Sequence, residues 1–588
     1  MKQFLKYTLA STLGVLFALF LGLFILIGIM ASIMASGEEE VEVAQKSVLQ
    51  IKLEHSLQDR SSNDPASIFN MGDLSLEPKP GMTEVVKSIE KATQDPAIEG
   101  LYLNIPTVMA GTAQLQEIRE ALMLFKESGK FIVAYADGYD QKGYYLSSAA
   151  DELYVHPEGT ILFKGLGVES MFFKGTLEKL DVELQVIRHG KFKAAVEPFI
   201  LEKMSDANRE QTSALIHSIW GDLLSGISQS RNISTLKLNQ IADKLTVENP
   251  AKAVELGFVD ATKYPDEIAQ ILKEKLGLNE DDELELIELD KYMNSTFYNA
   301  EEYSKERIAV IYATGEIKGG KGDDTFIGEK NIRQALIDAR KDDKVKSIVL
   351  RVNSPGGSAL VSDLIWREVI LTKEEKPIVV SMGNVAASGG YYISCAANYI
   401  YADATTITGS IGVFGIIPYT GKMMTKKLGV TFDQVTTNDN ANFITTNQPL
   451  NAYQRQMIQN SVERVYESFI GKVAEGRNMT KEDVDRIGQG RVWSGTQALE
   501  IGLVDELGSL DDAINKAAEL AELTEYSIQS LPLQKDPIQQ IIEDITGQST
   551  STMLKYYMGN DYKYVEVFEG LNNRAVIQTR LPFGWSVK

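Results

Sequence analysis

A serine at position 388 lies in a segment whose composition suits a nucleophile. Residues 384–394 read NVAASGGYYIS, so Ser388 is flanked by small residues and followed by Gly389, after which the pattern becomes helical. A serine at a helix N-terminus lies beside unpaired backbone N–H groups and the positive end of the helix dipole. The N–H of Gly389 is then a candidate donor to an oxyanion. The same pattern also fits an ordinary serine N-cap, a common structural role.

A pair of glycines supplies a second candidate donor. In RVNSPGGS, residues 351–358, Gly356 and Gly357 directly follow a predicted strand. Their backbone N–H groups can point at a second carbonyl oxygen position near the serine. Pro355 and Gly356 also fit the two central positions of a type II turn. The turn and the oxyanion donor are compatible interpretations.

The elements that must position these residues alternate between strands and helices. Short apolar runs such as SIVLRV, PIVVSMG and YIYAD have the length and β-branched content of buried strands. The segments between them, such as residues 362–373, have helical spacing and length. This alternation predicts an α/β fold with parallel sheets covered by helices.

The pattern occurs twice. Gly143-Tyr144-Tyr145 matches Gly390-Tyr391-Tyr392 at an offset of 247, and AVELGFVD (253–260) matches ALEIGLVD (498–505) at an offset of 245. Two landmarks at nearly the same offset indicate a tandem duplication. We therefore divide the chain into four parts: an anchor and linker at 1–46, a first copy at 47–290, a second copy at 305–530, and a tail at 535–588 that belongs to neither copy and in which a terminal hairpin is possible.

A serine nucleophile needs a base. The chain has four histidines and none follows residue 217, so the second copy contains none. Candidates near an aligned position lie in VIRHGKFKAAVEPF (186–199) of the first copy, which presents His189, Lys191 and Lys193. Lys193 precedes an apolar AAV run, where desolvation would lower its pKa and yield the neutral amine that a base must be. The alternative is a surface lysine in a basic cluster.

The two copies have lost complementary parts of a site. Aligning them puts Gln141 opposite Ser388, and the first copy reads NIPTVMAG where the second has its glycine pair. The same alignment puts Lys193 opposite Asn440 or Ala441. Each copy thus keeps the half that the other lacks, which predicts one composite site between them.

The bulk composition excludes several classes of protein. With a single cysteine, Cys395, the chain has no intramolecular disulfide and no multi-cysteine zinc site, and it contains no HExxH motif. We therefore expect no metal and no cofactor. The net charge of −22 argues against a protein that binds nucleic acid, because phosphate contacts need a basic face.

The N-terminus predicts a membrane anchor. From Thr8 to Ala35 the chain has 28 residues without a charge, more than the ~20 that cross a bilayer as a helix. Lys2 and Lys6 precede this stretch, so the short N-terminal end is expected in the cytoplasm and the body on the periplasmic side of the inner membrane. Small residues around Ser36 leave a cleavable signal peptide as the alternative, although its apolar core would exceed the usual ~7–15 residues.

Four segments carry a resemblance to a known family. VNSPGGS, NVAASGGYYIS, TGSIGV and GKFKAAVEPF resemble the signature segments of signal peptide peptidases (protease IV) in their long, duplicated form, and the likeness covers the anchor and both copies. The resemblance implies a Clp/crotonase-like fold of repeated ββα units and a homotetramer. It also implies that Ser388 is the nucleophile and Lys193 the general base. Phe192 and Ala194 stand where the family usually has Tyr and Ser, which leaves open what orients the lysine amine.

The implied function is that of a membrane-anchored serine endopeptidase that degrades cleaved signal peptides, which are apolar and extended, through an acyl-enzyme. Two alternatives remain: a non-catalytic membrane scaffold on the same fold, and a crotonase-like acyl-CoA enzyme. The sequence leaves open the cleavage preference, the physiological substrate, the role of the tail, and whether Ser388 and Lys193 pair within one chain or between chains.

Overall fold

The computed structural model describes most of the chain. The described residues are 2–35, 41–63, 69–70, 75–76, 79–295, 297, 304–534 and 577–580. Most of the predicted tail, and with it the first strand of the possible hairpin, lies outside them.

The first copy forms a parallel six-stranded sheet in the order β8-β6-β5-β4-β1-β9. Its strands are β1 (Ser47–Ile51), β4 (Ile98–Leu103), β5 (Phe131–Tyr139), β6 (Glu152–Ile161), β8 (Ala261–Thr262) and β9 (Leu286–Glu288). Among the helices that cover this sheet are α3 (Met82–Gln94), α4 (Thr112–Glu127) and α5 (Gln141–Ser147). The apolar side chains of these elements share one core.

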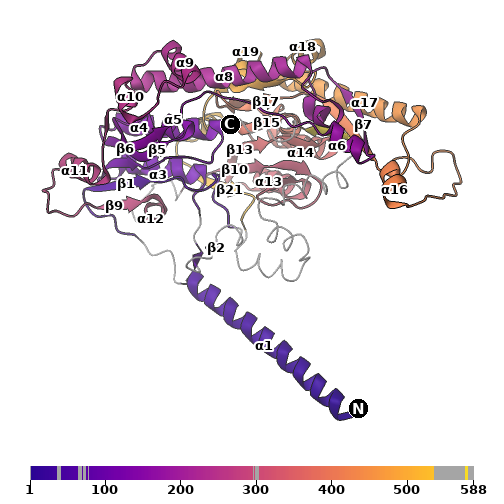
Figure 1. Cartoon of the computed structure of the whole chain (residues 1–588), viewed down its shortest axis with the longest axis horizontal. Coiled ribbons are helices and arrows are strands. Elements are labelled where there is room, and N and C mark those ends of the chain that lie inside the picture. Colours follow the sequence, from indigo (N-terminus) through magenta and orange to yellow (C-terminus); the bar gives the residue numbers. More distant parts are fainter. Residues whose placement is uncertain are drawn as a thin grey trace.

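The second copy repeats this arrangement in an eight-stranded sheet (Figure 1). Its main path is β19-β17-β15-β13-β10-β21, with β16 beside β15 and β20 beside β16, and all its pairs are parallel except β17 with β19. The strands are β10 (Arg307–Thr314), β13 (Val345–Ser354), β15 (Ile378–Ala387), β16 (Tyr399–Ala402), β17 (Ile407–Gly409), β19 (Val492–Ser494), β20 (Glu506–Leu507) and β21 (Ser527–Leu531). The central β13 and β15 are buried along nearly their whole length, as expected of parallel strands covered on both faces.

Equivalent helices recur at the offset that the sequence predicts. α8 (Asp206–Arg231) and α17 (Ala452–Arg477) are each 26 residues long and begin 246 residues apart. α4 and α14 (Ala359–Lys373) begin 247 apart. The α/β class and the duplication are therefore confirmed.

A third sheet joins the copies, in the order β12-β11-β14-β22-β18-β7. Its strands are β7 (Glu183–His189), β11 (Glu316–Lys318), β12 (Phe326–Gly328), β14 (Gly356–Ser358), β18 (Val413–Tyr419) and β22 (Ile577–Arg580). β7 comes from the first copy and pairs antiparallel with β18 of the second along seven residues. This pairing fixes the segment after β7 against the second copy.

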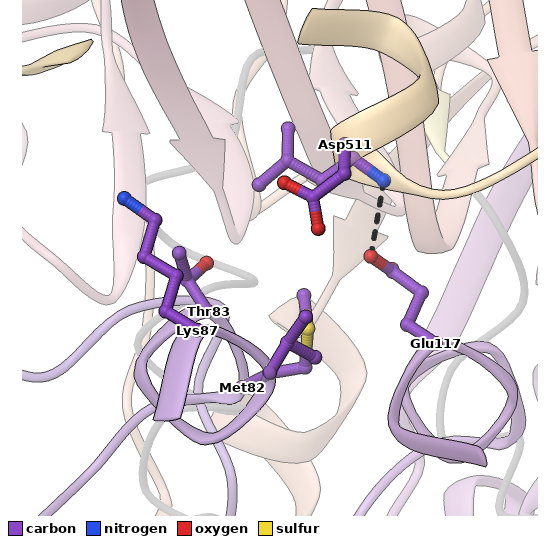
Figure 2. Close-up of a pocket in the computed structure, with 7 residues that line it drawn as sticks. Met82, Thr83, Lys87, Glu117 and Asp511 are labelled. Atoms are coloured by element: carbon purple, nitrogen blue, oxygen red, sulfur yellow. Dashed lines mark hydrogen bonds between the residues drawn. The ribbon is translucent and has the colours of Figure 1, made fainter. Parts of the chain in front are cut away.

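A buried charge cluster also spans the two copies. The guanidinium of Arg351, on β13, contacts the carboxylates of Glu117, on α4, and Asp59, and the side chains of all three are almost completely buried. Glu117 also accepts a hydrogen bond of 3.1 Å from the N–H of Leu510, at the start of α20 (Leu510–Leu520), beside a small pocket lined by α3, α4 and α20 (Figure 2). The cluster locks the orientation of one copy against the other.

The N-terminal helix α1 (Lys2–Ala35) points away from the two copies (Figure 1). Part of the predicted anchor lies outside the residues whose side chains are described. Over the residues that are described, no helix meets the length and apolarity needed to cross a membrane.

Candidate active site

Ser388 lies at the sharp junction between β15 and α15 (Gly389–Ser394). Its backbone has φ 56° and ψ −109°, and its side chain makes no capping hydrogen bond to the helix. The interpretation as an ordinary N-cap is therefore wrong. Positive φ is uncommon for a residue other than glycine, and such strain is concentrated at functional sites. The Ser388 N–H donates to the carbonyl of Gly409 at 2.8 Å, which holds this conformation in place.

The glycines after Ser388 are required by close packing. A Cβ on Gly389 would lie 2.7 Å from the Oγ of Ser362, and one on Gly390 would lie 2.7 Å from the carbonyl oxygen of Ser354. Both distances are shorter than van der Waals contact. The junction therefore fits directly against the end of β13 and against α14, between which β14 carries the second glycine pair.

Lys193 of the first copy reaches Ser388 of the second within the same chain. Its Nζ lies 2.8 Å from the Oγ of Ser388, 3.0 Å from the carbonyl oxygen of Ser410 and 3.1 Å from the Oγ of Ser410. The sequence predicted that these two side chains would meet, although they are 195 residues apart. The alternative of a surface lysine is wrong, because Lys193 is completely buried.

Burial lowers the pKa of Lys193 well below its usual value. The cause is desolvation, because a buried ammonium loses its hydration. Among the described ion pairs none involves Lys193, and Ala194, Ala195 and Val196 beside it are also buried. The neutral amine, which can accept a proton, is therefore present at a lower pH than in an ordinary lysine.

The second copy holds the lysine segment in position. The N–H of Phe192 donates to the carbonyl of Gln489 at 2.9 Å, and a Cβ on Gly490 would lie 2.7 Å from the Cβ of Lys193. Ser410 then orients the amine itself. The Ser410 hydroxyl therefore orients the lysine amine in a chain that has Ala194 where the family usually has a serine.

Ser410 is the site residue that sequence reasoning missed. Its segment, TGSIGV, was noted only as part of the resemblance. Like Ser388, it has positive φ, 50°, and is completely buried. The small residues of this segment were the one sequence feature that could have indicated a position packed closely against the site.

The predicted oxyanion donors lie next to one another. A Cβ on Gly389 would lie 3.1 Å from the backbone nitrogen of Gly357, and one on Gly356 would lie 2.6 Å from that of Gly389. Gly356 has φ 94°, as the type II turn requires, and its own N–H donates to the Oγ of Ser354 at 3.1 Å. The N–H groups of Gly357 and Gly389 are thus the better placed pair.

The other basic candidates do not contact Ser388. A ring nitrogen of His189 lies 2.6 Å from a carboxylate oxygen of Glu463, and the ring stacks on Tyr466. The Lys191 ammonium lies 4.8 Å from the centre of the Phe192 ring and is exposed. Of the three residues, only Lys193 reaches the serine.

Gln141, the position of the first copy equivalent to Ser388, has a structural role. Gln141 starts α5, and its amide oxygen accepts hydrogen bonds from the N–H groups of Lys164 and Gly165 at 3.1 and 2.9 Å. A side chain held in this way leaves no nucleophile at that junction.

Comparison with known proteins identifies the family. The model of peptidase family S49 matches the chain twice, over residues 124–279 and 370–524. The chain is a member of peptidase family S49. The two matches begin 246 residues apart, as do α8 and α17. Membership makes the protein a serine protease.

Full-length relatives support the assignment to the S49 family. The chain is 38% identical to Protease 4 of Haemophilus influenzae over 74% of this chain and 72% of the relative. It is 35% identical to the chloroplastic serine protease SPPA of Arabidopsis thaliana over 80% of this chain and 69% of the relative. The recognition as a protease IV of the SppA type is confirmed. A solved ClpP1 mutant from Listeria monocytogenes also matches, with a TM-score of 0.25 and 15% identity over 35% of this chain and 94% of that one.

Proposed function

We propose that this S49 protease hydrolyses peptides at one composite site, with Ser388 as nucleophile and Lys193 as general base. The observation that carries the proposal is the 2.8 Å approach of a completely buried amine to the serine hydroxyl. Neutral Lys193 takes the proton of Ser388, whose Oγ attacks a peptide carbonyl carbon. The protonated lysine gives that proton to the leaving amine, and water then hydrolyses the acyl-enzyme.

Backbone groups stabilise the charge that forms during this attack. The N–H groups of Gly357 and Gly389 are the proposed donors to the tetrahedral oxyanion, since Gly356 donates to Ser354 instead. Ser410 keeps the lysine amine aimed at the serine. The Clp-like arrangement that the resemblance implies is consistent with the parallel sheets and the glycine-rich turn.

The proposed substrates are extended, apolar peptides such as cleaved signal peptides. The resemblance suggests them, and an extended main chain can pair with β14 and its glycine pair in the way that β22 does.

We further propose that α1 anchors the protein in the inner membrane with the body on the periplasmic side. Support comes from the uncharged stretch between Thr8 and Ala35 and from exposed apolar side chains along the helix, among them Phe17, Phe20 and Phe24. The native protein should keep its first 35 residues and require detergent for extraction. An N-terminus at Ser36 by Edman sequencing would contradict this.

A homotetramer is proposed for the assembled protein. α16 (Gly421–Leu428) and the segment after it project from the body (Figure 1) and expose a group of large apolar side chains: Leu428, Val430, Phe432, Val435, Phe443 and Ile444. Exposed apolar surface of this kind is typical of an interface between proteins. Light scattering of the detergent-extracted protein tests it; a monomer would contradict it.

Substitution of the dyad tests the proposed chemistry. Ser388→Ala and Lys193→Ala should each abolish hydrolysis of a fluorogenic peptide without unfolding the protein. The double variant should be no worse than either single one, because the two residues act as a unit. His189→Ala is the matched control and should retain activity. Substantial activity in Lys193→Ala would overturn the proposal.

A further inference from the structure

The strand that leads to Ser388 contains a bulge. Where β15 pairs with β13, its residues 383–385 lie opposite the single residue Asn353. The pairs that flank the bulge are Val352 with Met382 and Ser354 with Ala386. A bulge bends its strand and re-aims the side chains beside it, and bulges are common next to active sites. The direction in which β15 presents Ser388 therefore depends on how this bulge is held.

The side chain of Asn353 holds the bulge. Its amide oxygen accepts a hydrogen bond of 3.2 Å from the N–H of Val385, three residues before Ser388. Val385 has no main-chain partner on β13, so the side chain supplies the acceptor that the strand pairing omits. The position of Val385, and of the junction that follows it, thus depends on the orientation of the Asn353 amide.

A buried carboxylate of the first copy fixes that orientation. The amide nitrogen of Asn353 donates to a carboxylate oxygen of Asp59 at 2.9 Å, and the Asp59 side chain is almost completely buried. The other carboxylate oxygen accepts from Arg351 at 3.5 Å and from the amide nitrogen of Gln114 at 3.4 Å. A carboxylate accepts and a backbone N–H donates, so the Asn353 amide fits between Asp59 and Val385 in one orientation.

The main chain at Asp59 is itself held by the first copy. Its carbonyl accepts hydrogen bonds from the N–H and the hydroxyl of Thr83, in the first turn of α3, at 3.1 and 2.7 Å. A continuous series of contacts therefore runs from α3 through Asp59 and Asn353 to the bulge. By this route the first copy reaches the nucleophile as well as the base.

The equivalent asparagine of the first copy makes no such contact. LYLNIP (101–106) matches LRVNSP (350–355), which puts Asn104 opposite Asn353. The amide nitrogen of Asn104 donates to the hydroxyl of Tyr102 at 3.4 Å, and β4 pairs with β5 in continuous register. The junction after β5 carries Gln141 in place of a nucleophile. An asparagine bridging a carboxylate and a bulge is thus found in the copy that has a serine to position.

We propose that Asp59 and Asn353 are positioning residues through which the first copy sets the placement of Ser388. The proposal rests on the dyad chemistry proposed above. Both side chains act through the N–H of Val385, and the surroundings of Lys193 do not involve them. A misplacement of about 1 Å can cost about 10²-fold in rate, so a loosened bulge should slow attack by Ser388.

Exchange of the two side chains tests the inference. In the double variant Asp59→Asn with Asn353→Asp, the new amide can donate to the new carboxylate, which can still accept from the N–H of Val385. The number of charges is unchanged. Asn353→Asp alone instead brings two carboxylates together, and Asp59→Asn alone brings two amide nitrogens together or turns one towards Arg351.

The measurements are the rate at which a fluorophosphonate labels Ser388, and kcat and KM on a fluorogenic peptide. Asn353→Asp should lower the labelling rate and kcat by about 10- to 100-fold, and the double variant should recover most of that loss. KM and the pH at which activity falls should match wild type, because the glycine pair and Lys193 are unchanged. Asn104→Asp is the matched control and should be labelled at the wild-type rate.

The outcomes separate this inference from the dyad. A wild-type labelling rate in Asn353→Asp, or a double variant as slow as that single one, overturns the positioning role and leaves the dyad standing. So does a variant in which less protein folds and less label is finally bound while the folded chains react at the wild-type rate. No labelling of Ser388 in wild type overturns the dyad and the inference with it. If Asn353→Asp does not fold, the double variant decides: it must fold and be labelled at close to the wild-type rate.

Discussion

Replacing Lys193 by methionine should abolish activity and yet stabilise the protein at neutral pH. Methionine has a similar length, is apolar and cannot accept the serine proton. Loss of general-base catalysis alone costs about 10²–10⁴ in rate, and more where two residues act as a unit. A catalytic residue whose removal stabilises the fold is one that the structure holds in an unfavourable environment.

The size of the stability gain follows from the burial of the amine. Its pKa is lowered well below the usual value, and each unit corresponds to about 1.4 kcal/mol between the two protonation states. Methionine forfeits three hydrogen bonds, one to Ser388 and two to Ser410, each of which contributes about 1 kcal/mol net. The cost of keeping the amine neutral grows with the size of this pKa shift, whereas the cost of the lost hydrogen bonds is fixed, so we expect the large shift to make the substitution stabilising at pH 7.

The pH dependence of this gain has a defined sign. Between the folded and unfolded pKa values of Lys193 the unfolded chain binds a proton and the folded chain does not, so wild-type stability rises with pH. The advantage of Lys193→Met should shrink from pH 7 towards about pH 10.4, where the unfolded lysine also becomes neutral. The same titration predicts that activity falls at acidic pH, as Lys193 becomes protonated.

The assay is thermal unfolding of wild type and Lys193→Met across this pH range. Lys191→Met, at an exposed lysine, is the control, and its stability should differ little from that of wild type. If wild type were the more stable protein at pH 7, with a difference that does not vary with pH, the lysine would be charged and paired in the folded state. The proposed role as a neutral base would then fail.

Three other perturbations test separate parts of the account. Gly357→Ala should lower kcat by about 10²–10³ in the peptide assay, because it displaces an oxyanion donor; unchanged kcat would point to another donor. Arg351→Met should lower the free energy of unfolding by about 3–5 kcal/mol, since it leaves the buried carboxylate of Glu117 unpaired; an unchanged thermal midpoint would refute this. Mixing Ser388→Ala with Lys193→Ala should restore no hydrolysis, because both residues of a site come from one chain; recovery would mean that sites form between chains.

Much of the architecture could be predicted because it depends on local patterns. The apolar runs of β13 and β15 and the matched offsets of the two copies are visible in the sequence, and the structure confirms the parallel sheets and the duplication. The complementary losses at Gln141 and around Asn440 predicted that Lys193 and Ser388 would meet. Their side chains are in contact, whereas their catalytic roles stay a prediction.

The remaining features depend on contacts between distant segments. The sequence of β22 contains no local signal that selects β14 and β18 as its neighbours. The sequence of β7 likewise contains none for its pairing with β18 of the other copy. Ser410 orients the lysine through a positive φ that its residue type disfavours. Such a conformation is fixed by the surrounding fold, so a sequence read segment by segment does not reveal it.

Covalent labelling with a fluorophosphonate, located by peptide mapping, tests the central claim most directly. A serine activated by a buried lysine should be labelled at Ser388, at a rate that falls by orders of magnitude in Lys193→Met and stays unchanged in His189→Ala and Lys191→Met. Label on another residue, or undiminished labelling of Ser388 in Lys193→Met, would contradict a serine–lysine site assembled from the two copies.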